Sequence, residues 1–249
     1  MKRIAIYGKG GIGKSTVASN VSAALACNGY TVMQIGCDPK SDSTKNLTGG
    51  HRIRTVLDVM REKKTDVLLD DVIAHGYSDV LCVEAGGPIP GTGCAGRGII
   101  TAFELLEELD AYQVFKPDIV IYDVLGDVVC GGFAMPIRQG YADSVYIVTS
   151  GEMMSLYAAD NIARAVKSFA KHKYASLKGL IYNAKGIENE DETVAKAAAE
   201  IGTQTFFKIE RDGNVQKAEN AGMTVIEYAP DSVLAEKYTE LAKRIMEEA

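Results

Sequence analysis

The chain has 249 residues, of which 47% are hydrophobic and 24% charged, the composition of a globular protein that can bury a sizeable core. Its net charge of −6 argues against nucleic acid as the main partner, because phosphate backbones require a basic surface. No apolar run has the length of a membrane span and the chain begins with a charged pair, so we expect a cytoplasmic protein without a membrane partner.

Short apolar segments alternate with helical patterns, which predicts a single α/β domain over residues 1–249 with a mainly parallel sheet and helices on both faces. The expected strands are Arg3–Tyr7, Thr31–Gly36, Val80–Glu84, Ile119–Asp123, Ser144–Thr149, Leu177–Asn183, Thr205–Ile209 and Thr224–Tyr228. The expected helices are Lys14–Asn28, Thr55–Glu62, Arg97–Leu109, Ser155–His172, Glu190–Ile201, Asn214–Ala221 and Ser232–Glu248. Ligands of such sheets bind beyond the carboxyl ends of the strands, so the segments after the strands are the candidate sites.

The segment after the first strand matches the phosphate-binding motif G-x-x-x-x-G-K-[ST], which predicts a P-loop NTPase. The residues assigned to it are Gly8, Lys9, Gly10, Gly11, Ile12, Gly13, Lys14, Ser15 and Thr16. We expect its N–H groups and the helix N-terminus to hold the phosphates of ATP or ADP, with Lys14 on the β- and γ-phosphates and Ser15 on Mg²⁺. The alternative is a plain glycine turn between a strand and a helix.

The segment Gly36–Thr44 follows the second strand and is the next candidate. Asp38 is expected to act on the attacking water or on Mg²⁺, Asp42 to reach the Mg²⁺ shell, and Lys40 to contact the nucleotide. The alternative is a polar turn in which the Asp and Ser side chains bond to their own backbone.

A third segment follows the apolar strand that ends at Asp123, where P-loop enzymes place an aspartate that senses Mg²⁺. Gly126 is expected to offer its N–H to the γ-phosphate and Asp127 to orient water, as in a switch loop that relaxes on hydrolysis. Cys130 lies only seven residues after Asp123, so at about 3.3 Å per residue the two are no more than roughly 23 Å apart.

The five cysteines are widely spaced, which in a reducing compartment favours buried thiols or metal ligands over disulfides. Cys94 and Cys130 are flanked by glycines, which leave room for a bulky cluster, and Cys94 precedes a helix whose N-terminus favours the thiolate. A four-iron cluster needs four thiolates, which two copies of the chain supply as two each. The alternative is a pair of free thiols. We expect Cys27 and Cys82 to be small core residues and Cys37 to pack behind a switch.

Over nearly its whole length the sequence resembles the nitrogenase iron protein family. The matching stretches are Tyr7–Thr16, Gly36–Thr44, Cys82–Thr101, Tyr122–Ile137, Gly151–Ile162 and Glu210–Tyr228. Lys9, the second residue of the loop, is a mark of the deviant Walker A group to which this family and the partition ATPases belong; the alternative is an exposed loop lysine. The resemblance implies an ATP-dependent homodimeric reductase in which Lys9 reaches the partner's nucleotide.

The resemblance also implies roles for residues elsewhere in the chain. Cys94 and Cys130 would bridge one [4Fe–4S] cluster between the two subunits, and Arg97 beside the cluster would help to dock the acceptor protein. The switches and the hydrolytic site would comprise Asp38, Asp42, Asp123 and Asp127. The residues on the adenine side would be Asn183, Glu210, Asp212 and Gln216, although the family usually has proline where this chain has Glu210.

The expected partners are a second copy of the chain, a nitrogenase-like catalytic protein, and an electron donor such as ferredoxin or flavodoxin. Family relatives also serve tetrapyrrole reductases of chlorophyll synthesis, the nickel-tetrapyrrole cyclase of methanogens and thioether-cleaving systems, and the sequence leaves the acceptor open. Two alternatives belong to other classes: a partition- or septum-site-type positioning ATPase, which requires a DNA or membrane surface, and an iron–sulfur carrier.

Overall fold

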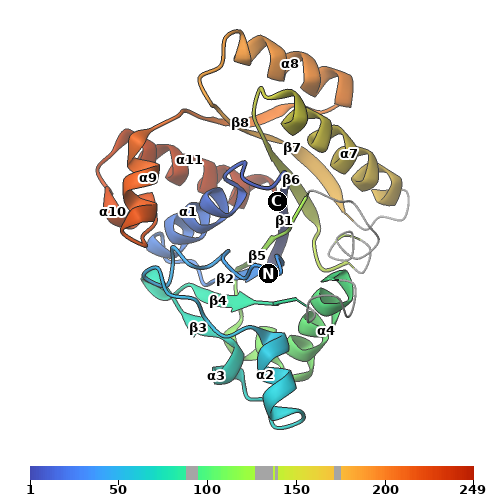
Figure 1. Ribbon diagram of the computed structural model, residues 1–249, viewed down its shortest axis with the longest axis vertical. Helices are drawn as coiled ribbons and strands as arrows, with labels where there is room; N and C mark the ends of the chain where they lie inside the picture. Colours follow the sequence, from blue (N-terminus) through green and yellow to red (C-terminus); the bar gives the residue numbers. More distant parts are fainter. Residues whose placement is uncertain (88–94, 127–136, 138–139, 171–174) are drawn as a thin grey trace.

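A sheet of eight strands forms the centre of the computed structural model, which describes residues 1–87, 95–126, 137, 140–170 and 175–249 (Figure 1). The strands are β1 (Lys2–Gly8), β2 (Val32–Gly36), β3 (Ala74–His75), β4 (Leu81–Glu84), β5 (Ile119–Asp123), β6 (Ser144–Thr149), β7 (Ser176–Asn183) and β8 (Thr205–Ile209). Their order is β3-β4-β2-β5-β1-β6-β7-β8, and every neighbouring pair is parallel except β3 with β4. The predicted α/β class with a mainly parallel sheet is confirmed.

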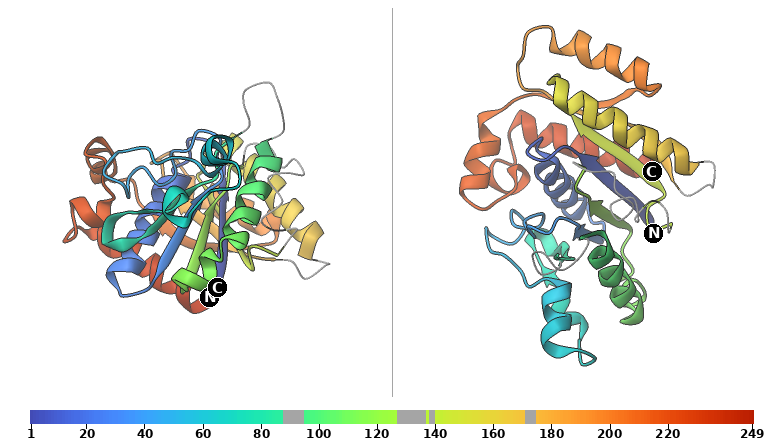
Figure 2. Two further views of the ribbon diagram at one scale, coloured as in Figure 1. Left: turned by 90° about the horizontal axis from the view of Figure 1, so that it is seen from below. Right: turned by 45° about the vertical axis from the view of Figure 1, so that its right-hand side comes forward.

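Helices cover both faces of this sheet (Figures 1 and 2). They are α1 (Lys14–Cys27), α2 (Val56–Lys63), α3 (Leu69–Val72), α4 (Ala95–Glu108), α5 (Ala111–Phe115), α7 (Met153–Ala170), α8 (Glu190–Ile201), α9 (Gly213–Asn220), α10 (Val225–Tyr228) and α11 (Val233–Glu248), with a short 3₁₀ helix, η1 (Tyr77–Asp79). Helices α1, α9, α10 and α11 pack on one face, and α2, α4, α5, α7 and α8 pack on the other. In the described part of the chain, no helix is both long and apolar enough to cross a membrane.

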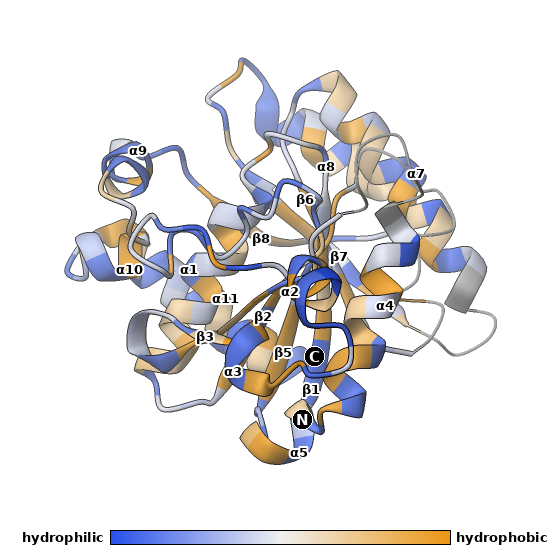
Figure 3. Cartoon of the chain, turned by 60° about the horizontal axis from the view of Figure 1, so that its bottom comes forward, coloured by the Kyte–Doolittle hydropathy of each residue, from blue (hydrophilic) through white to orange (hydrophobic). Residues whose placement is uncertain are grey.

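The alternation of side chains along each strand produces two separate cores. In β1, Ile4 and Ile6 point into the core beneath α1 and α11, whereas Ala5 and Tyr7 point into the core beneath α4 and α7. Strands buried on both faces read as continuous apolar runs, which is why the sequence locates them well. Figure 3 shows that the central strands are mostly hydrophobic, whereas many loops are hydrophilic.

Every expected strand but the last is present, with bounds shifted by no more than one residue. The prediction of a strand at Thr224–Tyr228 was wrong, because this β-branched stretch forms the short helix α10. Thr224 caps the helix by accepting a hydrogen bond from Glu227 N, and Oδ1 of Asn20 on α1 accepts the N–H groups of Val225 and Ile226. The side chain of Asn20 thus satisfies two backbone N–H groups that a neighbouring strand would otherwise have to satisfy.

Candidate functional site

A cavity of about 470 Å³ lies at the carboxyl end of the sheet, where the segments after β1, β2, β5 and β7 converge. The predicted residues that line it are Lys9, Gly10, Gly11, Gly13, Lys14, Ser15, Thr16, Asp38, Lys40, Asp42 and Asn183. These residues are distributed over more than 170 positions of sequence, and the parallel sheet brings their strand ends to one edge.

The phosphate-binding loop is held in place from β7 at its far end. Gly11 and Gly13 have φ angles of 75° and 94°, the left-handed region that glycine adopts without strain. Asn183 Nδ2 donates a 2.7 Å hydrogen bond to the carbonyl of Ile12, and a Cβ on Gly13 would lie 2.6 Å from the same nitrogen. Asn183 therefore contacts the loop backbone directly, and glycine at residue 13 makes that contact possible.

Lys14 and Asp123 form a buried ion pair at the base of the cavity. Lys14 Nζ lies 2.5 Å from Asp123 Oδ1, and the two side chains are only 6% and 1% exposed. Burial alone would lower the pKa of Lys14, but the charge and hydrogen bond of Asp123 outweigh it and raise that pKa above its ordinary value. Ser43 Oγ donates to the other carboxylate oxygen of Asp123 at 2.6 Å. The predicted phosphate lysine and the predicted Mg²⁺-sensing aspartate are thus in direct contact.

The segment 38–44 forms one wall of the cavity and is also a polar turn. Asp38 accepts a 2.9 Å hydrogen bond from the N–H of Lys40, and Ser41 has a φ angle of 53°. The polar turn is therefore present, and it places Asp38, Lys40 and Asp42 in the lining of the cavity, while their roles toward nucleotide and Mg²⁺ stay a prediction.

The charges that line the cavity suit a polyphosphate with a divalent cation. Four lysines supply positive charge: Lys9, Lys14, Lys40 and Lys185. Asp38 and Asp42 supply carboxylate oxygens, the ligands that Mg²⁺ prefers, and Ser15 adds a hydroxyl at the helix start. Gly126 follows β5 against Gly8, and a Cβ on it would lie 2.5 Å from the Gly8 carbonyl oxygen. Its backbone consequently lies directly against the root of the loop.

The other residues assigned to the base lie outside the set that lines this cavity. Glu210 pairs with Lys208 at 2.9 Å on the surface. Asp212 caps α9 by accepting the N–H of Asn214 at 2.7 Å, and Gln216 is exposed on that helix. Their assignment to adenine stays a prediction that rests on the resemblance.

Several residues that line the cavity were missed by the sequence analysis: Leu125, Lys185, Val215, Glu219 and Tyr238. Glu219 accepts a 2.6 Å hydrogen bond from the hydroxyl of Thr16, which links α9 to the start of α1. Lys185 carried a sequence clue, as a cation two residues beyond the end of β7. Leu125 lies two residues beyond β5, whereas Val215, Glu219 and Tyr238 lie on α9 and α11, far along the chain, and reach the cavity only through the packing of these helices.

The cysteines divide into two groups. The two glycine-flanked cysteines, Cys94 and Cys130, lie outside the described residues. The predicted site residue Asp127 lies outside them as well. Cys37 and Cys82 are buried as predicted, and burial raises the pKa of Cys82 to about 12 and that of Cys37 well above its usual range, so both are poor thiolate donors.

Cys27 was wrongly predicted to be a core residue. It ends α1 on the exposed side of the helix, with its sulfur 3.3 Å from Ser78 Oγ. Arg97 is exposed near the start of α4, directly after the stretch that contains Cys94. The two thiols of Cys94 and Cys130 are of the donor type that holds iron–sulfur clusters.

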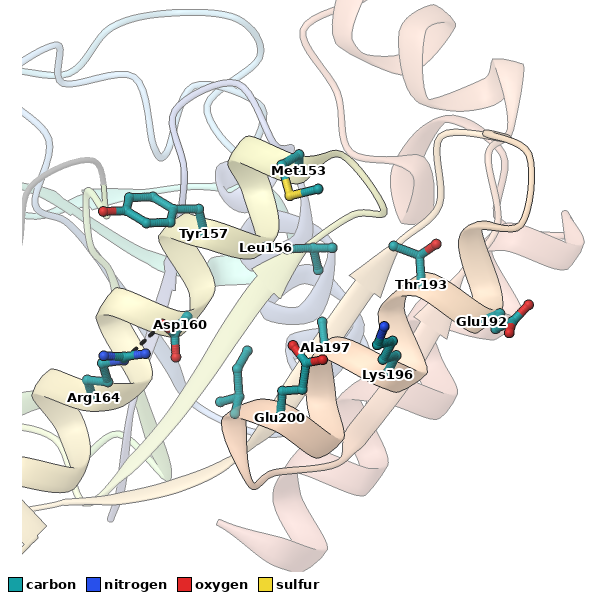
Figure 4. Close-up of a pocket in the computed structure, with 11 residues that line it drawn as sticks. Met153, Leu156, Tyr157, Asp160, Arg164, Glu192, Thr193, Lys196, Ala197 and Glu200 are labelled. Carbon is teal, nitrogen blue, oxygen red and sulfur yellow. Dashed lines mark ion pairs between the residues drawn. The ribbon is translucent and has the colours of Figure 1, made fainter.

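A second cavity of about 490 Å³ lies between α7 and α8 (Figure 4). Its wall includes the ion pair of Asp160 with Arg164 on α7, and Lys196 and Glu200 on α8. None of the predicted site residues lines it, so we assign no part of the nucleotide site to it.

Solved structures with a similar fold include a cell division ATPase and a ParA family ATPase. The cell division ATPase MinD of Pyrococcus furiosus superposes with a TM-score of 0.74 at 20% identity and covers 100% of this chain and 99% of its own. A ParA family ATPase from Chlorobium tepidum gives a TM-score of 0.73 at 23% identity and covers 97% of this chain and 98% of its own. At such identities the likeness shows the fold alone, and it agrees with the predicted α/β sheet covered by helices on both faces.

Curated relatives are much more similar in sequence. The nitrogenase iron protein of Methanospirillum hungatei is 55% identical over 99% of this chain and 88% of its own length. Nitrogenase iron protein 2 of Methanothermococcus thermolithotrophicus is 49% identical over 99% of this chain and 89% of its own length. A model of the 4Fe–4S iron sulfur cluster binding proteins of the NifH/frxC family matches residues 2–249. The chain therefore belongs to the NifH/frxC family of 4Fe–4S iron–sulfur cluster binding proteins, as its sequence predicted.

Proposed function

We propose that this protein is the ATP-hydrolysing reductase component of a nitrogenase-like system. As a homodimer it donates single electrons, coupled to MgATP hydrolysis, to a separate catalytic protein. One observation carries the proposal: in a chain with nitrogenase iron protein relatives along its whole length, the Lys14–Asp123 pair joins the phosphate loop to the segment 38–44. Family membership by itself supports the broader class of ATP-dependent electron-transfer reductases.

The residues around the cavity bind and position the nucleotide. Lys14 would hold the β- and γ-phosphates, Ser15 would ligate Mg²⁺, and Asp123 would act near the same ion. Asp38 and Asp127 orient the attacking water. Catalysis of this kind depends on positioning and charge stabilisation rather than on covalent chemistry.

The redox part of the proposal rests on the two glycine-flanked cysteines. Cys94 and Cys130 from the two copies would together hold one [4Fe–4S] cluster per dimer, which would supply one-electron chemistry. Arg97, exposed near the start of α4, is available to dock the acceptor. The electron donor is a ferredoxin or a flavodoxin, and the five widely spaced cysteines suit a reducing cytoplasm.

A second copy of the chain is expected to cover the edge of the sheet that carries the cavity. Met153, Met154 and Tyr157, at the start of α7, are 77%, 61% and 62% exposed. Helix α7 follows β6, and β6 pairs in parallel with β1, so these apolar side chains emerge on the same edge as Lys9. Clustered apolar side chains of this size are typical of a surface that a partner covers. This supports the proposal that Lys9 crosses to the partner's nucleotide.

Two alternative functions remain to be compared with this proposal: a positioning ATPase without a cluster, and a reductase that serves a different acceptor. A positioning ATPase is disfavoured, because the relatives at 49–55% identity are named nitrogenase iron proteins, whereas the MinD and ParA structures share only 20–23% identity. Reduction of a nickel tetrapyrrole or of another substrate in place of dinitrogen stays open, since it changes the acceptor and leaves this chain's site unchanged.

The proposal is tested by reconstituting the purified protein with iron and sulfide under anaerobic conditions. We expect about four irons per dimer and a paramagnetic signal on one-electron reduction. Cys94→Ala and Cys130→Ala should each abolish the signal, while Cys27→Ala serves as the matched control and should retain it. A wild-type protein without a paramagnetic signal would refute the redox function, and loss of the cluster to the acceptor during turnover would indicate a carrier.

A further inference from the structure

Glu84 is a buried carboxylate at the end of β4 that sequence analysis assigned no role. It is 1% exposed, and its Oε1 accepts two hydrogen bonds from Thr44, one from N–H at 2.7 Å and one from Oγ1 at 2.8 Å. Among the residues that the structure describes, Oε2 has no hydrogen-bond partner. Burying a carboxylate is unfavourable unless hydrogen bonds replace its lost contacts with water. The burial of Glu84 therefore depends on its two hydrogen bonds with Thr44.

The strand beside Glu84 is shaped to admit its side chain. Gly36 on β2 pairs directly with Glu84 in the parallel ladder. A Cβ on residue 36 would lie 2.0 Å from Glu84 Oε2, which is far inside van der Waals contact. Glycine at residue 36 therefore leaves the space that the carboxyl group fills, and the two positions act as one fitted pair.

The residue that Glu84 holds is the last of the nucleotide-binding segment 38–44. Ser43, immediately before Thr44, donates to Asp123 Oδ2 at 2.6 Å, and Asp123 pairs with Lys14. Gln34 Nε2 donates to both the carbonyl and the hydroxyl of Ser43 at 3.0 Å. A continuous series of polar contacts thus runs from Glu84 through the segment to the phosphate lysine.

The other end of the same segment rests on the residues after β4. A Cβ on Gly87 would lie 2.7 Å from Cβ of Pro39, the neighbour of Asp38. The N–H of Ala85 also donates to the carbonyl of Gly36 at 2.9 Å. Residues 84–87 therefore contact segment 38–44 at both ends, whereas Asp38 and Asp42 between those contacts face the cavity.

We propose that Glu84 is a positioning residue for ATP hydrolysis: by fixing Thr44 it sets the place of segment 38–44, and with it Asp38 and Asp42, relative to the Lys14–Asp123 pair. The inference deepens the ATPase part of the proposed function and depends on it. It does not require that Glu84 touch the nucleotide.

The protonation state of Glu84 suggests a suitable conservative variant. Burial raises the pKa of this carboxyl to about 7, the hydrogen bonds from Thr44 oppose the rise, and the charges of Asp123 and Asp42 add to it. The neutral acid is thus well populated near neutral pH. Glutamine keeps an oxygen for both Thr44 donors and matches the neutral form in size and charge.

The test compares Glu84→Ala and Glu84→Gln, with Glu236→Gln on the exposed side of α11 as the matched control. In Glu84→Ala we expect kcat for ATP hydrolysis to fall by about tenfold or more, as when other residues that hold site residues in place are removed. The Kd for MgATP should change by no more than about twofold, because the phosphate loop is unaltered. Glu84→Gln should restore most of kcat, and the control should match the wild type.

Hydrogen exchange gives a readout that does not require turnover. Backbone amides in residues 36–48 should exchange faster in Glu84→Ala than in Glu84→Gln, while amides of α1 stay unchanged. Thr44→Val, which removes one of the two donors, is the second variant and should give an intermediate rate. If the wild type fails to hydrolyse ATP, the proposed function fails, yet the exchange comparison still tests Glu84.

Two results would overturn the inference. One is a folded Glu84→Ala protein whose kcat and exchange in residues 36–48 equal those of the wild type. The other is an equal loss of MgATP affinity and kcat in both Glu84 variants, which would identify a general structural role instead.

Discussion

At the scale of single residues, the buried Lys14–Asp123 pair would link the proposed nucleotide binding with the stability of the fold. The two charges compensate each other in a place where neither side chain is more than 6% exposed. Removing one partner of such a pair leaves the other charge buried and uncompensated, which is much less favourable than the loss of a surface ion pair. Lys14, which we propose to bind phosphate, therefore also stabilises the end of β5.

Lys14→Ala should accordingly lose MgATP binding and lower the free energy of unfolding by about 3 kcal/mol. Urea denaturation measures the change, and Lys9→Ala, in the same loop but only partly buried, is the control and should stay within about 0.5 kcal/mol of the wild type. The double variant Lys14→Met/Asp123→Asn should regain part of the loss. A Lys14→Ala protein as stable as the control would show that Asp123 is compensated in another way.

Local sequence identified the residues of this site that belong to a motif and missed those that depend on packing. Lys14, Ser15 and Asp123 follow directly from a loop and a strand end. Ser43 and Glu84 are ordinary polar residues in sequence, and their part in the site arises only because β2, β4 and β5 lie side by side. Nothing within a few residues of either one indicates that contact.

At the scale of elements, Glu190 ties together the loops that follow β6 and β7. Its carboxylate accepts hydrogen bonds from the N–H groups of Gly151, Lys185, Gly186 and Ile187 at 2.8–3.1 Å. Burial tends to raise the pKa of Glu190, but these four donors outweigh it and lower that pKa below its ordinary value of 4.5. Lys185 of the nucleotide cavity and the exposed start of α7 are thereby fixed relative to each other.

Glu190→Gln should lower the midpoint of thermal unfolding by roughly 3 °C at pH 7. Because the folded-state pKa lies below 4.5, the stabilisation is complete above that pH and is lost as the pH falls through the folded-state pKa. The difference between variant and wild type should therefore shrink in acid. Scanning calorimetry from pH 7 to pH 3 measures it, with the exposed neighbour Glu188→Gln as control; a difference that does not depend on pH would contradict this account.

The elements themselves were predicted where burial and periodicity agree. Buried strands such as β5 and β6 were placed to the residue, and the error at Thr224–Tyr228 came from a β-branched stretch whose backbone bonds go to Asn20. The short β3, α3 and α5 were missed, because two to five residues carry too little periodicity to be recognised.

At the scale of the whole molecule, the parallel sheet places the proposed nucleotide cavity and the apolar start of α7 on one edge. An ATP-dependent dimer that closes over this edge would bury Met153, Met154 and Tyr157 together with Lys9. Such a geometry would explain why large apolar side chains are exposed beside a strongly polar cavity.

Met153→Glu should then weaken the ATP-dependent dimer at least about tenfold in Kd, because an unpaired charge would be buried against the second copy. Sedimentation velocity with and without MgATP measures the change. Val233→Glu is the matched control, since Val233 is 72% exposed at the start of α11, and it should leave the dimer intact. Equal effects of the two substitutions, or none from Met153→Glu, would place the interface elsewhere.

The fit of Glu84 against Gly36 also has an evolutionary consequence. The two residues are 48 positions apart, yet any side chain at residue 36 would occupy the space of the Glu84 carboxyl group. Selection can therefore change them only as a covarying pair, with a larger residue at position 36 accompanied by a shorter one at position 84. An alignment of relatives can be searched for this linkage, and those that keep Gly and Glu together should share the same support behind their nucleotide segment.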